Sequence, residues 1–479
     1  MNESKTSPAM NRRSFLGQAS TAVAGGIALS RLPIARFAHA AGSDAIKIAL
    51  IGCGGRGTGA ADHNINTHAL GELKLVAMAD AHRDRLEQSY NILSNKHKDR
   101  VDVSEGNKFV GLDAYKEAIS LCDVVVTATP PGFRPMIFEE AVRQGKHVFM
   151  EKPVAVDGPG VRKVLEAAKV AKEKNLKVGV GLQRHHQPNY IESMKRIHGG
   201  EIGDIVSMRC YWNGGPVGPK MRRADLEKKL GHPPTEMEYQ LRNWYNFVWT
   251  CGDHIDEQHI HNLDVCNWVK NGYPVKCHGM GGRAYLHEPD HGEIFDHHAV
   301  EYEYADGSRM FSQCRQIPGC ISDVSEHIVG TKGKWDSRGF ALIDFKGEIK
   351  WRYRAPSGTP EPVKGKAKGK APAGSGDEEL ARYKSGASND GHQLEHFPFM
   401  EAVRKNKPFN EAENGAKSSL TAIMGRMATY SGKLVTWEEA LNSKLDLMPE
   451  KLAWDANPKV MPGPDGKYAY AMPGKMVAF

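Results

Sequence analysis

The densest group of ionisable side chains lies in residues 250–269, which read TCGDHIDEQHIHNLDVCNWV. If the segment is one helix, a turn of roughly 100° per residue places His254, Glu257, His261 and Asp264 on one face. We interpret His261 as a general base for a hydroxyl proton, Glu257 as the group that orients its imidazole or shares the proton, and Asp264 as a holder of a substrate hydroxyl. Two alternatives stay open. The histidines could bridge a domain interface, or His254, Glu257 and His261 could coordinate zinc. The histidine spacing lacks a close H-x-x-x-H pair, so we predict no metal site.

A second candidate is a lysine at the end of a predicted strand. The run HVFMEKP at 147–153 is apolar up to Met150 and ends in Glu151, Lys152 and Pro153. In an open α/β sheet, ligands bind beyond the carboxyl ends of the strands. There the Lys152 ammonium can bond a substrate oxygen and stabilise charge as a hydroxyl becomes a carbonyl. The sequence therefore predicts that Lys152 and His261 reach the same alcohol.

A glycine-rich loop indicates a binding site for a dinucleotide cofactor. Residues 45–57, AIKIALIGCGGRG, form an apolar strand that ends in Gly52, Gly54 and Gly57. The first glycine permits a tight turn, the second lets backbone N–H groups approach a pyrophosphate, and the third lets the next helix pack closely. The loop therefore predicts a dinucleotide site. The predicted cofactor-binding residues are Gly52, Gly54, Gly55, Arg56, Gly57, Asp80, Thr129, Pro130, Glu151 and Lys152.

The choice of dinucleotide depends on Asp80, which ends the second apolar strand, KLVAMAD. A carboxylate at this place accepts hydrogen bonds from ribose hydroxyls and repels a 2′-phosphate, so NAD is favoured. Arg83 keeps NADP possible, because a guanidinium can pair with that phosphate.

Two domains are needed to position these groups. Over 44–182, the apolar runs KIALIG, KLVAMAD, DVVVTAT, HVFMEKP and KVGVGLQ alternate with stretches of helical periodicity, which indicates a parallel sheet covered on both faces. We predict a Rossmann NAD(P)-binding domain there, with 91–108 as a loop. Residues 183–449 alternate in polarity, with turns at Asp306–Gly307 and Lys332–Gly333, and predict a substrate-binding domain with an antiparallel sheet. Within it, 355–391 is predicted to be a flexible insertion, and 450–479 a C-terminal arm on the surface or on a neighbouring subunit.

The first 40 residues predict export. Arg12 and Arg13 precede an apolar small-residue stretch, and Ala38-His39-Ala40 forms an A-x-A cleavage site. We predict a twin-arginine signal peptide over 1–40, the twin-arginine machinery as a partner, and a periplasmic or otherwise exported protein. The apolar stretch is too short for a stable membrane anchor. Free NAD is scarce outside the cell, so the cofactor is expected to be tightly held.

Composition fits a globular enzyme. The chain has 479 residues, 40% of them hydrophobic, and a formal net charge of +7 to which the leader contributes, so nucleic-acid binding is not indicated. Eight cysteines show no C-x-x-C spacing, and we predict no disulfide framework. Cys314 and Cys320 are the pair to check.

Together, the GCGGRG loop, the E-K-P at 151–153 and the pattern D/E-x-x-x-H-x-x-D at 257–264 resemble the Gfo/Idh/MocA family of oxidoreductases. The resemblance implies an α/β fold with an N-terminal Rossmann domain and a C-terminal α/β domain whose sheet is large, open and mostly antiparallel. It implies homo-oligomers, dimers or tetramers, built through that sheet. It also matches Lys152 to the family lysine near nicotinamide and substrate, His261 to the catalytic histidine, and Arg184 to an arginine near the substrate site. Glu257 stands where many members have aspartate.

We therefore predict an exported NAD(P)-dependent oxidoreductase that acts on CH–OH groups of a sugar, cyclitol or glycoside. The alternative is an NAD-dependent glycosidase or lyase that uses transient oxidation at C3, and a non-catalytic nucleotide- or sugar-binding protein is less favoured. The predicted substrate-binding residues are Arg184, Asp264 and Tyr245. Tyr211 is a further candidate acid or base, and aromatic residues at 211, 212, 244, 245 and 249 suit a sugar face.

Overall fold

The computed structural model describes residues 45–217, 221–356, 376–385 and 388–476. The predicted signal peptide, 1–40, lies outside the described residues. So do residues 357–375 and 386–387 of the predicted insertion.

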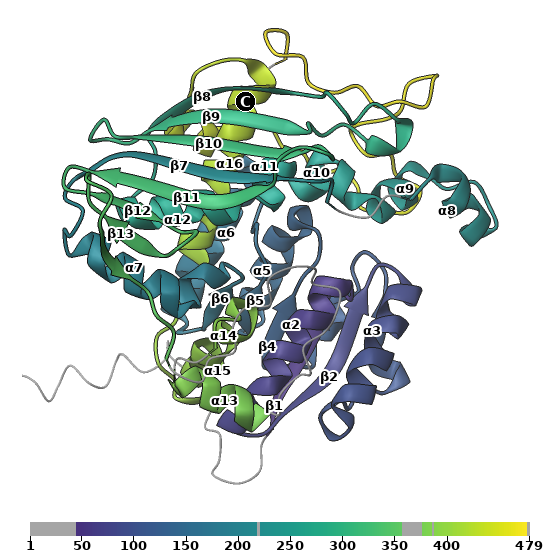
Figure 1. Ribbon diagram of the computed structural model, residues 1–479. Helices are drawn as coiled ribbons and strands as arrows, with labels where there is room; N and C mark the ends of the chain where they lie inside the picture. Colours follow the sequence, from purple (N-terminus) through teal and green to yellow (C-terminus); the bar gives the residue numbers. More distant parts are fainter. Residues whose placement is uncertain (1–44, 218–220, 357–375, 386–387, 477–479) are drawn as a thin grey trace, which may run out of the picture. The chain divides into compact units, whose positions relative to one another are not determined.

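The first half is a six-stranded parallel sheet with the strand order β3-β2-β1-β4-β5-β6 (Figure 1). Its strands are β1 (Ile46–Ile51), β2 (Leu73–Asp80), β3 (Lys108–Val110), β4 (Val124–Thr127), β5 (His147–Met150) and β6 (Val178–Val180). The connecting helices are α2 (Gly55–Ile65), α3 (Arg83–Lys96), α4 (Tyr115–Ser120), α5 (Arg134–Arg143) and α6 (Gly158–Glu173). This order confirms the predicted Rossmann sheet. The order reverses between β1 and β4, where such sheets bind ligands.

The predicted loop over 91–108 is wrong at its start, because α3 continues to Lys96. Only Leu86, Ser89 and Leu93 of this helix are buried. Because so few positions of this helix are apolar, its last turns look like a polar loop in the sequence, and the prediction missed them.

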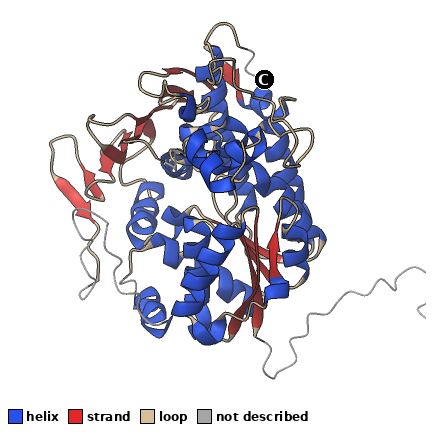
Figure 2. Cartoon of the chain, turned by 90° about the vertical axis from the view of Figure 1, so that its right-hand side faces the viewer, coloured by secondary structure: helices blue, strands red, loops and turns tan. Residues whose placement is uncertain are grey.

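The second half contains a nine-stranded sheet with the order β14-β13-β12-β11-β7-β10-β9-β8-β15. Its strands are β7 (Ile205–Gly214), β8 (Lys276–Gly282), β9 (His297–Glu303), β10 (Arg309–Gln316), β11 (Asp323–Gly330), β12 (Lys334–Asp336), β13 (Ala341–Ile343), β14 (Ile349–Arg352) and β15 (Val435–Thr436). All pairings are antiparallel except that of β7 with β10, so the predicted sheet is confirmed. The helices α12 (Ile260–Lys270) and α16 (Ala412–Ser431) pack on it. Figure 2 shows helices beside the strands in both halves.

After the second sheet, the chain returns to the first half. The helices α13 (Gly376–Ser385), α14 (Gly391–Leu394) and α15 (His396–Arg404) precede α16. Phe399, Met400 and Val403 of α15 share a buried core with Val126 and Phe149 of the Rossmann sheet. Residues 391–404 therefore pack with the nucleotide-binding half, although we predicted them to be part of the substrate-binding domain.

The described part of the predicted insertion also differs from expectation. Residues 376–385 are helical, Leu380 is buried, and the ring of Tyr383 stacks on that of Phe397 at 4.9 Å. Lysine and glycine richness in the surrounding segment concealed this short helix.

All eight cysteines are free thiols, and Cys314 is buried while Cys320 is exposed, so these two do not pair. No helix of the described residues is long and apolar enough to cross a membrane.

Candidate functional site

A cavity of about 600 Å³ lies between the two halves of the described chain. Its wall carries the carboxyl ends of β1, β2, β4 and β5 on one side and residues of the second half on the other. The predicted site residues that line it are Gly52, Gly54, Gly55, Arg56, Asp80, Thr129, Pro130, Glu151, Lys152, Glu257 and His261. The fold thus gathers most of the predicted cofactor residues and all three predicted catalytic residues around one space.

The glycine loop fits a pyrophosphate. Gly52 has φ +89°, and a Cβ on Gly57 would lie 1.8 Å from the Gly52 carbonyl oxygen, so both positions require glycine. A Cβ on Gly54 or Gly55 would meet no protein atom within 4 Å, and both glycines line the cavity. The N-terminus of α2 has no side-chain cap. Its backbone N–H groups and helix dipole therefore suit an anion.

Asp80, the last residue of β2, is held beside the glycine loop. Its two carboxylate oxygens accept hydrogen bonds from Cys53 N at 2.6 Å and His82 N at 2.8 Å. Burial raises the pKa of Asp80, and these two hydrogen bonds oppose that rise. Arg83, considered for a 2′-phosphate, pairs instead with Glu87 at 3.3 Å and does not line the cavity.

Lys152 and Glu257 meet at the wall of the cavity. The Lys152 ammonium donates to the backbone oxygen of Glu257 and lies 3.4 Å from Glu257 Oε1. Burial raises the pKa of Glu257, although the positive charges of Lys152 and Arg134 oppose the effect. Glu257 Oε2 is buried and has no hydrogen-bond partner among the described residues. These contacts hold an amine at the wall and leave a carboxyl oxygen available to a ligand.

His261 lies in the first turn of α12, and its ring stacks on that of Trp212 with centroids 5.7 Å apart. Its Nδ1 is buried without a hydrogen-bond partner in the described part of the chain. Burial lowers the pKa of His261 well below its ordinary value, and the positive charges of Lys152 and Arg184 lower it further. The imidazole is therefore neutral near pH 7 and able to accept a proton.

The expectation of one helix over His254 to Asp264 is wrong. The chain forms a short helix, α11 (His254–Glu257), which ends before α12 begins at Ile260. His254 Nδ1 lies 3.0 Å from the Tyr245 hydroxyl, and His254 does not line the cavity with Glu257 and His261. The three groups considered for zinc are therefore not gathered on one face. The described residues contain no group of three or more His, Cys, Asp or Glu placed to hold a metal.

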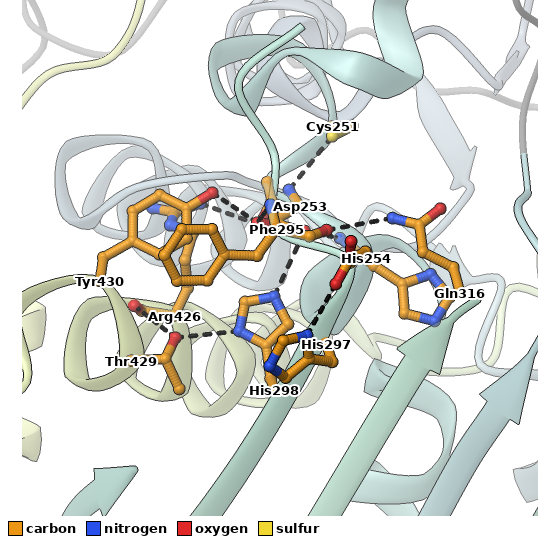
Figure 3. A network of polar contacts seen from close by, with 12 residues as sticks. Cys251, Asp253, His254, Phe295, His297, His298, Gln316, Arg426, Thr429 and Tyr430 are labelled. Atoms are coloured by element: carbon orange, nitrogen blue, oxygen red, sulfur yellow. Dashed lines mark hydrogen bonds and ion pairs between the residues drawn. The ribbon is translucent and has the colours of Figure 1, made fainter. Parts of the chain in front are cut away.

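A buried polar network fixes α11 and hence Glu257 (Figure 3). Asp253 adopts φ +76° and its carboxylate accepts from His254 N, from Phe295 N at 2.9 Å and from the Tyr430 hydroxyl. His298 Nε2 lies 3.3 Å from the same carboxylate. Burial raises the pKa of Asp253, but contacts with His298 and Tyr430 outweigh it and the net pKa is lowered. The network thus anchors the start of the helix that carries Glu257 to Lys152.

The three residues predicted to bind substrate do not line the cavity. Arg184 pairs with Glu326, which is fully buried. Asp264 accepts from Ser418 Oγ at 2.8 Å and lies 2.7 Å from His185 Nε2. The Tyr245 hydroxyl meets His254. Each of the three side chains is engaged by other residues of the protein, and Asp264 lies outside the cavity although His261, one turn earlier on α12, lines it.

Several lining residues escaped the sequence analysis as site residues. His392 at α14 lies 123 residues after the end of the histidine-rich segment at residue 269, and Gln183 and Gln258 also line the cavity. The His392 Nδ1 atom is 3.8 Å from Glu395 Oε1, and Arg56 Nε is 2.9 Å from Glu151 Oε1. Nothing local in the sequence marks His392, because only the return of the chain to the Rossmann half brings it to the cavity.

Comparisons with known proteins agree with this geometry. Residues 46–182 match the model of Gfo/Idh/MocA, described as an oxidoreductase family with an NAD-binding Rossmann fold. The scyllo-inositol 2-dehydrogenase (NAD(+)) of Bacillus subtilis is 25% identical over 267 residues, which cover 54% of this chain and 65% of that protein, just under two thirds of its length. An inositol 2-dehydrogenase of Burkholderia cenocepacia is 29% identical over 293 residues, with coverage of 60% and 72%. The family match confirms the predicted NAD-binding Rossmann fold over residues 46–182, and the relatives agree with the predicted oxidoreductase activity.

Solved structures share the fold. The scyllo-inositol dehydrogenase of Lactobacillus casei with bound NAD(H) and scyllo-inositol matches with a TM-score of 0.56 at 19% identity, covering 82% of this chain and 99% of that one. The aldose-aldose oxidoreductase of Caulobacter crescentus, complexed with glycerol, matches with a TM-score of 0.57 at 16% identity, covering 82% and 100%. The predicted two-domain α/β architecture is confirmed by these matches.

Proposed function

Since residues 46–182 match the NAD-binding Rossmann model of the Gfo/Idh/MocA oxidoreductase family, we propose that this chain moves hydride between tightly held NAD and an alcohol carbon of a sugar, cyclitol or glycoside. One observation carries the proposal: a single cavity extends from the glycine loop and Asp80 to Lys152, Glu257 and His261. The inositol dehydrogenases among the relatives support a polyhydroxylated substrate.

The roles of the side chains follow from their charges and contacts. Bound NAD supplies the hydride acceptor. The Lys152 ammonium, held by Glu257, hydrogen-bonds the substrate oxygen and stabilises negative charge on it. The neutral His261 imidazole accepts the hydroxyl proton, and Glu257 orients Lys152 rather than His261. The stacked Trp212 ring holds the imidazole in place.

The test is a turnover assay with the purified protein, NAD⁺ or NADP⁺, and a panel containing myo-inositol, scyllo-inositol, glucose and their glycosides. We expect enzyme-bound NADH to form with at least one free polyol, together with one equivalent of keto product per bound nucleotide. Absence of NADH binding, together with absence of any redox product across the panel, would contradict the proposal.

The second candidate is glycoside cleavage with transient oxidation at C3. One observation favours it: His392 adds a second imidazole to the cavity wall, and elimination next to a ketone needs a second acid or base. In this scheme the ketone acidifies the C2 proton, a base removes that proton, the aglycone leaves from C1, water adds there, and hydride returns to C3. Release of aglycone without net formation of NADH would favour this candidate, whereas keto product without cleavage favours the first.

We also propose that the protein is exported by the twin-arginine pathway and assembles through its open sheet. Residues 11–17 and 38–40 support export, and the strand surfaces of the nine-stranded sheet away from α12 and α16 offer the face for assembly. A fusion of residues 1–44 to a reporter should reach the periplasm and should stay in the cytoplasm when Arg12 and Arg13 are both changed to Lys. Sedimentation of the mature protein measures the assembly directly.

A further inference from the structure

We propose that the second half of the chain completes the dinucleotide site, by closing α8 (Arg223–Leu230), α9 (Glu236–Arg242) and the segment 452–455 over its adenosine end as a clasp. This inference rests on the proposed use of NAD. It adds cofactor-retaining residues that lie outside the Rossmann domain and outside the glycine loop.

The adenosine end of the cavity is identified by Asp80, the carboxylate suited to the ribose hydroxyls. Asp80, His82 and Arg85 line this end from the Rossmann half. Leu241, Arg242 and Trp244 line the cavity from the second half. Because α8 and α9 lie beside α3 (Figure 1), the two walls are close enough for direct ion pairs.

Asp84 on α3 connects the walls. Arg242 donates two hydrogen bonds to the Asp84 carboxylate, from Nη2 to Oδ1 at 2.7 Å and from Nη1 to Oδ2 at 3.1 Å. Lys229 on α8 donates to Oδ2 at 2.6 Å. The Arg242 side chain is 7% exposed, so its guanidinium group is largely shielded from water. A bidentate pair of this kind is directional and stronger than a single surface contact.

The C-terminal segment adds a second connection. The Trp454 ring lies over the ring of His82, with centroids 5.5 Å apart. The backbone oxygen of Trp454 accepts from Thr235 Oγ1, the N-cap of α9, at 2.7 Å. Leu452 and Trp454 also face Leu112 and Tyr115 across a second hollow, and the cofactor cavity shares Leu112 and Tyr115. The segment therefore lies beside the adenosine end and is joined to α9.

These contacts must open before a dinucleotide can leave past this end of the cavity. A closed clasp acts on the dissociation rate more than on the association rate, because its contacts break only during release. The consequence is a nucleotide that stays bound between turnovers, as an exported enzyme requires.

The test measures the release of NADH from the purified protein by fluorescence, after mixing with excess NAD⁺. Asp84 and Trp454 do not line the cofactor cavity, so Asp84→Asn and Trp454→Ala change the clasp without removing a cavity-lining group. We expect each variant to release NADH about tenfold faster than the native protein. The matched control is Glu139→Gln, which breaks the exposed Lys163–Glu139 pair at 2.8 Å on the same half and should leave the rate unchanged.

A measurement on the unmodified protein covers the case in which a variant fails to fold. Asp84 and Lys229 are 41% and 43% exposed, so salt screens their attraction and should accelerate NADH release. Native release rates in both variants, with unchanged melting temperatures and no salt effect, would overturn the clasp while leaving the proposed function intact. A native protein that binds no NADH would overturn both.

Discussion

At the scale of single residues, Lys152 and His261 are expected to affect the chemical step much more than cofactor binding. Changing either residue to Ala should lower kcat by about 10²- to 10⁴-fold, because each interacts with a group whose charge changes in the reaction. NADH affinity should stay within a few-fold of native, since the glycine loop is untouched. Steady-state kinetics and NADH titration make this measurement, with Lys163→Ala as an exposed-lysine control. Native kcat in both variants would remove the assignment.

Arg184 is expected to stabilise the fold. Its guanidinium pairs with Glu326, which also accepts from Asn262 Nδ2 and, at 3.1 Å, from the Tyr190 hydroxyl. Arg184→Ala leaves a buried carboxylate without its cation, and such losses cost about 3–5 kcal/mol. Urea unfolding should detect this loss, whereas Arg143→Ala, at an exposed pair with Glu140, should not. A raised KM with native stability would instead restore Arg184 as a substrate contact.

The sequence predicted residues whose local pattern carries their role. Gly52, Asp80 and Lys152 were identifiable because each follows a run of strand-forming residues, and the carboxyl ends of parallel strands meet at one edge. Asp264 does not line the cavity, and its contacts with Ser418 and His185 could not be predicted because both partners are distant in the sequence. His392 was missed because no local pattern surrounds it.

At the scale of elements, two glycines in the turn from β1 into α2 are expected to have different roles. Gly57 allows close packing within the protein, and Gly54 allows the ligand to approach the backbone. Gly57→Ala places a methyl group 1.8 Å from the Gly52 carbonyl oxygen and should destabilise the protein without any nucleotide present, by about 2 kcal/mol or more. Gly54→Ala meets open space in the protein and has φ −71°. It should keep native stability and weaken NADH binding, because its methyl group faces the pyrophosphate position.

Thermal melting of the nucleotide-free variants, followed by NADH titration, distinguishes the two effects. Equal loss of stability in both variants would show that Gly54 also serves packing. Native NADH affinity in Gly54→Ala would place the pyrophosphate elsewhere.

The limits of sequence reasoning at this scale lie in short turns. The Rossmann strands were predictable because continuous apolar runs require burial on both faces. The start of α11 was not, because Asp253 adopts φ +76° there and is held by Phe295 and Tyr430, which lie far from it in the sequence. The helical periodicity of α15 does not say which sheet the helix covers.

At the scale of the whole molecule, the cavity combines stretches that are far apart in sequence. Residues from the stretches 51–56, 151–152 and 257–261 line it together with His392, and Trp454 adjoins it through His82. Pattern analysis assigns each stretch an element and a period, and only the tertiary fold brings them together. The order of the domains and the presence of a cleft were therefore predictable, while the clasp and the second imidazole were not.

The stability of the whole molecule should depend on pH through Glu293, whose partly buried carboxylate accepts from Val248 N at 3.1 Å. Burial raises the pKa of Glu293 to about 7, and the negative charge of Asp253 adds to the effect. The folded protein therefore holds this proton more tightly than the unfolded chain, whose glutamate titrates near its ordinary value of 4.5. The stability contributed by the proton is full below that value and is lost as pH rises through about 7.

Glu293→Gln keeps the acceptor for Val248 N and removes the titration. Between about pH 5 and pH 8, the free energy of unfolding of the native protein should fall by about 1–2 kcal/mol more than that of the variant. Urea unfolding at both pH values measures the difference, with Glu139→Gln as the exposed control. Parallel pH dependence in native and variant protein would mean that water reaches Glu293 in the folded state and keeps its pKa near 4.5.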